Sequence, residues 1–89
     1  MSRIETPRVL VVDDEPPICR SVEKILAKVD VRTRSALNGY AALTLMETES
    51  FDVVITDLKM SSMGGLEVLR RIQEGNPDAV VVVMTGYAS

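Results

Sequence analysis

The 89-residue sequence contains no histidine and no tryptophan, and it has one cysteine and only three aromatic residues. Without histidine, the chain lacks the side chain most used for acid–base catalysis near neutral pH and a principal zinc ligand. The single cysteine, Cys19, excludes a disulfide within the chain and favours a reducing, cytoplasmic location. The scarcity of aromatic side chains argues against a surface on which nucleic-acid bases stack.

Strong net charge and long apolar runs are also missing. Ten basic and thirteen acidic residues give a net charge of −3 at pH 7, which provides no electrostatic attraction for nucleic acid. No apolar run approaches the roughly 18 residues of a membrane span, and no signal peptide opens the chain. Apolar residues make up 46% of the chain, so we expect one small domain over residues 1–89 with its own core.

Short strand-like segments alternate with segments of helical periodicity. We expect strands at residues 8–13, 31–36, 51–57 and 78–85, and helices at residues 16–29, 39–49 and 66–75. Continuous apolar strands separated by helices predict an α/β fold with an open parallel sheet covered on both faces. The polar second strand suits a sheet edge. If the first crossover runs to that edge and the next returns past the first strand, the strand order is 2-1-3-4.

Acidic residues follow two of these strands. Asp13 and Asp14 end the first strand, Asp57 ends the third, and Thr85 ends the fourth. In open α/β sheets the ligand site lies beyond the carboxyl ends of the strands, so we expect the three carboxylates to converge there. One aspartate at a strand end is explained by turn preferences, but three at neighbouring ends indicate a site. Hard oxygen ligands of this charge suit Mg²⁺.

The segments VLVVDDE, DVVITDLKM, GGLEVLRRI and VVVMTGYAS resemble the receiver domain of two-component response regulators over essentially the whole chain. This resemblance implies a flavodoxin-like fold and a phospho-acceptor rather than an enzyme. Asp57 would take a phosphoryl group from a sensor histidine kinase or phosphotransfer protein. Asp13, Asp14, Asp57 and the backbone carbonyl of Lys59 would bind Mg²⁺, and Thr85 would hydrogen-bond the phosphoryl group. The segment MTGYAS resembles receivers of nitrogen-regulator-type transcription activators.

Two features depart from the family pattern. Ser61 stands where the family usually has proline, which should loosen the loop after the third strand. The sequence stops just after the expected fourth strand, so we expect the fifth strand and the last two helices of the family pattern to be missing. The family's conserved lysine, which ends that fifth strand, also has no counterpart, because no lysine follows Lys59. We therefore expect an incomplete, N-terminal portion of a receiver that phosphorylates weakly by itself. We also expect self-association through the apolar edge of the fourth strand.

One alternative remains open at this point. The missing lysine is compatible with a receiver-like module that dimerises and signals without being phosphorylated. A phosphatase of the haloacid dehalogenase kind would need a second aspartate two positions after Asp57, where this chain has Lys59. A dinucleotide-binding domain would need a glycine-rich turn after the first strand, which the chain lacks.

Overall fold

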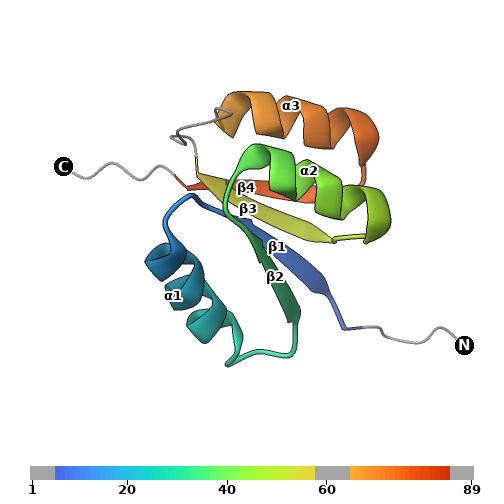
Figure 1. Ribbon diagram of the computed structural model, residues 1–89. Coiled ribbons are helices and arrows are strands. Elements are labelled where there is room, and N and C mark those ends of the chain that lie inside the picture. The colour runs from blue at the N-terminus through green and yellow to red at the C-terminus, as the bar shows by residue number, and fades with distance from the viewer. Residues whose placement is uncertain (1–5, 58–64, 85–89) are drawn as a thin grey trace, which may run out of the picture.

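The computed structural model describes residues 6–57 and 65–84. Strands and helices alternate along the chain, as the sequence pattern predicts (Figure 1). Their bounds are β1 Arg8–Val12, α1 Pro16–Leu26, β2 Arg32–Ala36, α2 Gly39–Thr48, β3 Val53–Asp57, α3 Gly65–Gly75 and β4 Val80–Met84.

The four strands form one parallel sheet in the order β2-β1-β3-β4, which confirms the expected topology. β1 lies between β2 and β3, and Val12 is opposite both Ala36 and Thr56. This register brings the carboxyl ends of β1 and β3 to the same edge of the sheet. The residues that follow β1 therefore lie next to Asp57, the last residue of β3.

Alternate residues of the central strands point to opposite faces of the sheet, and each face carries its own apolar core. Helices α2 and α3 cover one face and α1 covers the other (Figure 1). The α2–α3 core contains Leu10, Val12, Ala36, Ala42, Met46, Phe51, Val54, Val68 and Ile72. The α1 core contains Val9, Val11 and Cys19. Because β1 is apolar toward both faces, it reads as a continuous hydrophobic run in the sequence.

The helix starts follow from local sequence. Pro16 and Pro17 occupy the first positions of α1, where a missing backbone N–H breaks no intrahelical hydrogen bond. Asn38 caps α2, and its Oδ1 accepts a hydrogen bond of 2.8 Å from the backbone N–H of Ala41. Side-chain capping of this kind satisfies one of the free amides at a helix start.

Several predicted elements differ from the observed ones by one residue at an end, and α1, β3 and β4 differ by more. The fourth strand begins at Val80, two residues later than predicted. The first helix stops at Leu26, although the apolar spacing predicts a helix through residue 29. Ile25 and Val29 belong to that spacing but are 64% and 56% exposed, so the core does not hold the last turn in place. The third strand begins at Val53, two residues later than predicted, and Phe51, which precedes it, is buried in the α2–α3 core.

Candidate metal centre

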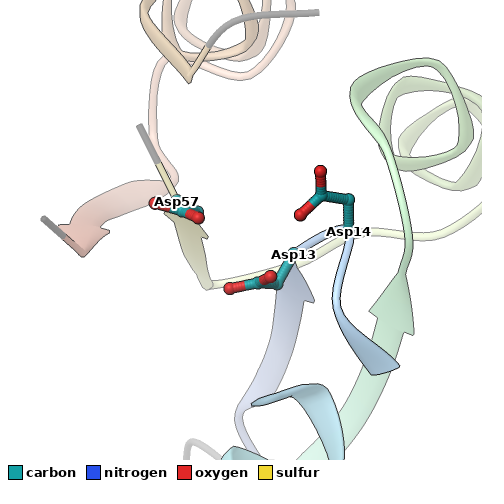
Figure 2. Close-up of side chains that lie close together, drawn as sticks. All are labelled: Asp13, Asp14 and Asp57. Atoms are coloured by element: carbon teal, nitrogen blue, oxygen red, sulfur yellow. The ribbon is translucent and has the colours of Figure 1, made fainter. Parts of the chain in front are cut away.

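Three aspartates meet at the carboxyl edge of the sheet, as the sequence predicts. Asp13 and Asp14 follow β1 directly, and Asp57 ends β3. Each contributes a carboxylate oxygen, and these oxygens lie within 4.8 Å of one another. Figure 2 shows the carboxylates of Asp13 and Asp57 approaching from the two neighbouring strands, with Asp14 beside Asp13. The parallel pairing of β1 with β3 brings these residues together from distant parts of the chain.

Asp13 is the most enclosed member of the cluster, with 3% of its surface exposed. Its backbone N–H donates to the carbonyl of Ala36 at 3.1 Å, and its Oδ1 accepts from the backbone N–H of Glu15 at 3.0 Å. Burial raises the pKa of Asp13, and the charges of Asp57 and Asp14 raise it further, whereas the hydrogen bond from Glu15 lowers it. A cation bound among these groups would oppose both pKa-raising effects.

The composition of the cluster fits a hard divalent cation. All three candidate ligands are carboxylates, and oxygen ligands are those that Mg²⁺ and Ca²⁺ prefer. Asp14 and Asp57 are only half-buried, so a bound ion could keep several water ligands. Negative charges within this distance repel one another, and a cation bound among them would offset that repulsion.

Only part of the expected site falls within the described residues. Lys59 and Thr85, expected to supply a carbonyl ligand and a hydroxyl, lie outside them, as does Ser61. The structure therefore brings together Asp13, Asp14 and Asp57 and leaves the roles of the other two as predictions.

Cys19 contacts the site, and the sequence reasoning did not anticipate this. Cys19 is 3% exposed, and its Sγ donates to the backbone carbonyl of Asp13 at 3.5 Å. In the sequence, only the proline pair that starts α1 indicated this contact between Cys19 and Asp13. It places the first helical turn directly after the strand, so that α1 folds back against the end of β1.

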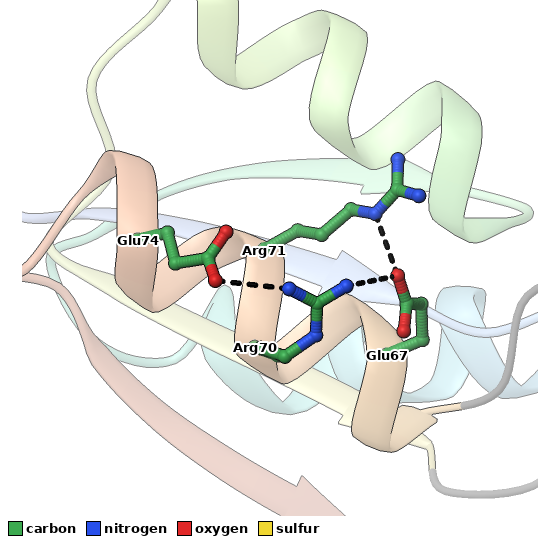
Figure 3. A network of polar contacts seen from close by, with 4 residues as sticks. All are labelled: Glu67, Arg70, Arg71 and Glu74. Atoms are coloured by element: carbon green, nitrogen blue, oxygen red, sulfur yellow. Dashed lines mark hydrogen bonds and ion pairs between the residues drawn. The ribbon is translucent and has the colours of Figure 1, made fainter.

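The basic pair on α3 belongs to a different kind of surface. Arg70 donates to Glu67 at 2.6 Å and to Glu74 at 2.9 Å, and Arg71 donates to Glu67 at 2.7 Å (Figure 3). The hydrogen bonds and charges of the two arginines lower the pKa of Glu67. Because both arginines are paired with acids on the same exposed face of α3, this surface is a solvated helix face.

Within residues 6–57 and 65–84, no helix is both long enough and apolar enough to cross a membrane.

Comparison with known proteins gives consistent matches. The family model of the response regulator receiver domain matches residues 9–89. Response regulator protein PilR of Pseudomonas aeruginosa is 37% identical over 82 residues, which cover 92% of this chain and 18% of that protein. Transcriptional regulatory protein ZraR of Klebsiella oxytoca is 37% identical over 81 residues, covering 91% and 18% respectively. The chain therefore spans less than a fifth of the length of these two relatives.

Solved structures match over most of the chain. The response regulator protein TrrA of Thermotoga maritima, crystallised in complex with Mg²⁺–BeF, gives a TM-score of 0.87 at 35% identity, covering 93% of this chain and 72% of that one. A chain in the crystal structure of histidine kinase ThkA in complex with TrrA gives a TM-score of 0.86 at 34% identity, covering 94% and 72%.

Proposed function

The chain belongs to the response regulator receiver domain family, and we propose on this basis that Asp57 accepts a phosphoryl group from a histidine kinase or phosphotransfer protein. In this proposal Mg²⁺ binds among Asp13, Asp14 and Asp57. The observation that carries it is the convergence of these three carboxylates within 4.8 Å.

The chemistry that this arrangement supports is in-line phosphoryl transfer. An oxygen of the Asp57 carboxylate attacks the phosphorus of a phosphohistidine, and the new O–P bond forms as the N–P bond to the partner's histidine breaks. Asp13 and Asp14 add negative charge that holds a cation beside the incoming group. When bound, Mg²⁺ would neutralise charge on the phosphoryl oxygens. Because the phosphoryl group stays on Asp57, the chain acts as an acceptor rather than an enzyme.

Three comparisons support the cofactor, the partner and the output. TrrA was crystallised with Mg²⁺–BeF and also with the histidine kinase ThkA, which favours Mg²⁺ and a kinase partner for this chain. ZraR carries the name of a transcriptional regulatory protein, which favours transcription control as the output of the whole protein. A cytoplasmic location fits a chain whose single cysteine is unpaired and buried.

Acetyl phosphate with MgCl₂ tests the proposal directly. We expect intact-mass spectrometry to find one added phosphoryl group on the wild type, and none on Asp57→Asn or without Mg²⁺. Asp30→Asn is the matched control, because it removes the same charge from an exposed residue outside the cluster. Phosphorylation of Asp57→Asn, or a wild type that stays unmodified even with a cognate kinase, would refute the proposal.

A second candidate is a module that self-associates through β4 without phosphorylation, and the composition of the two sheet edges favours it. The β2 edge carries Arg32 and Arg34, whose charges discourage strand pairing. β4 has the sequence VVVVM with no charge or proline, and Val80 and Val82 are 59% and 45% exposed. Within residues 6–57 and 65–84, β4 pairs with β3 alone.

Light scattering after size-exclusion chromatography tests this second candidate. We expect the average mass to rise with protein concentration for the wild type and to stay at the monomer value for Val82→Lys. Ile25→Lys introduces the same charged side chain at an exposed apolar position of α1 and should behave like the wild type. A wild type that remains monomeric at millimolar concentration would exclude β4 pairing.

A further inference from the structure

Cys19 lies where helix α1 meets the end of β1. The thiol is buried together with Val9 and Val11 in the α1 core, so packing on the sheet fixes its place. From there its Sγ donates a hydrogen bond of 3.5 Å to the backbone carbonyl of Asp13. The residue therefore touches the main chain of a candidate metal ligand while remaining out of reach of solvent.

This contact completes a set of anchors on Asp13. The backbone N–H of Asp13 donates to Ala36 on β2, and its Oδ1 accepts from the backbone N–H of Glu15 in the turn before α1. With the Cys19 bond, the N–H, the carbonyl and one carboxylate oxygen of Asp13 are all held by neighbouring elements. Movement of the peptide or rotation of the side chain would break at least one of these bonds.

A side-chain hydrogen bond also ties α1 to β2. The hydroxyl of Ser35 donates to the carboxylate of Glu23. Ser35 belongs to β2, whereas Glu23 and Cys19 belong to α1. The helix that carries the Cys19 donor is therefore held on the sheet by apolar packing and by this hydrogen bond.

We propose that Cys19 is a positioning residue which, by fixing the Asp13 peptide, makes the cation site prefer Mg²⁺ over Ca²⁺. This inference rests on the proposed metal-binding function. Mg²⁺ demands near-ideal octahedral geometry at roughly 2.0–2.1 Å, whereas Ca²⁺ accepts variable coordination at roughly 2.3–2.6 Å. A loosened Asp13 therefore weakens Mg²⁺ binding more than Ca²⁺ binding.

Calorimetric titration with MgCl₂ and CaCl₂ at constant ionic strength tests the inference. Cys19→Val removes the donor and keeps a small apolar side chain, whereas Cys19→Ser keeps a donor. We expect the Mg²⁺ Kd of Cys19→Val to rise about threefold, in line with loss of one weak hydrogen bond, and its Ca²⁺ Kd to change much less. Cys19→Ser should retain the wild-type ratio of the two constants. Cys19→Ala is a second variant without a donor, in case valine does not fit.

Ile72→Val is the control for stability alone, because Ile72 is fully buried on the opposite face of the sheet. It should leave both constants unchanged. If the variants without a donor keep the wild-type Mg²⁺/Ca²⁺ ratio, or weaken both ions equally, the positioning role of Cys19 is overturned while the metal site stands. A wild type that binds no Mg²⁺ overturns the proposed function and this inference together.

Discussion

Replacing Asp57 by asparagine should stabilise the metal-free protein, because it removes one of three mutually repelling carboxylates. Asp57 faces two other carboxylates, each with an oxygen within 4.8 Å. At that distance a pair of unit charges repels by about 3.5 kcal/mol at an effective dielectric of 20 and about 0.9 kcal/mol at 80. Asp57 and Asp14 are half-buried and Asp13 is buried, so we take the water-like value for each of the two pairs as a lower limit. We therefore expect Asp57→Asn to raise the free energy of unfolding by about 1 to 2 kcal/mol.

The same substitution should abolish stabilisation by Mg²⁺. At an Mg²⁺ concentration ten times its Kd, ligand linkage adds about 1.4 kcal/mol to the free energy of unfolding of the wild type. The variant, which lacks one ligand, should gain much less. Urea unfolding followed by far-UV circular dichroism, with and without MgCl₂ at matched ionic strength, measures both effects. Without metal, the melting temperature of the variant should rise by about 5–10 °C.

Asp30→Asn separates local repulsion from a change in net charge. Asp30 is exposed and does not belong to the cluster. Its replacement by asparagine changes the net charge by the same amount as Asp57→Asn but leaves the three carboxylates in place. It should alter neither the metal-free stability nor the response to Mg²⁺. The electrostatic reasoning is refuted if Asp57→Asn does not stabilise the metal-free protein beyond Asp30→Asn. An Mg²⁺ response that survives in Asp57→Asn would place the ion elsewhere.

Two further predictions concern Asp13 and the core. Because the folded state raises the pKa of Asp13 above its usual 3.8, mainly through burial, the folded protein binds the proton more tightly than the unfolded chain. We therefore expect the free energy of unfolding of the metal-free wild type to fall relative to that of Asp13→Asn as the pH rises. Urea unfolding of both proteins from pH 4 to 7 measures this difference, and a difference that does not change with pH would contradict the prediction. Ile72→Ala, at a fully buried position, should cost about 2–5 kcal/mol in urea unfolding. Ile25→Ala, at a 64% exposed position, should cost under about 0.5 kcal/mol, and equal losses would contradict the assigned burial.

The order of elements and the strand ends were predictable from the sequence because their signals are local. The apolar run of β1 stops at Asp13, and Pro16 and Pro17 start a helix soon after. Alternation of strands and helices restricts the sheet to a few parallel arrangements, of which the expected order is the one observed. Because each apolar run stops at an acidic residue, the sequence also predicts acids at the ends of β1 and β3.

The end of α1 was not predictable in the same way. Its apolar spacing continues to Val29, but a helix persists only where tertiary contacts bury that face. In the structure Ile25 and Val29 remain exposed, and the helix ends at Leu26. Helical periodicity alone does not show whether tertiary contacts bury an apolar side chain.

The sequence alone therefore determined which residues stand at the ends of the strands, because apolar runs and breaking residues act over a few neighbouring positions. Only the tertiary structure decided that the carboxylates of Asp13, Asp14 and Asp57 come within 4.8 Å, and that Cys19 holds the carbonyl of Asp13. These distances depend on strand register and on the packing of α1 against the sheet. Both are set by contacts between segments far apart in the chain, which no local pattern encodes.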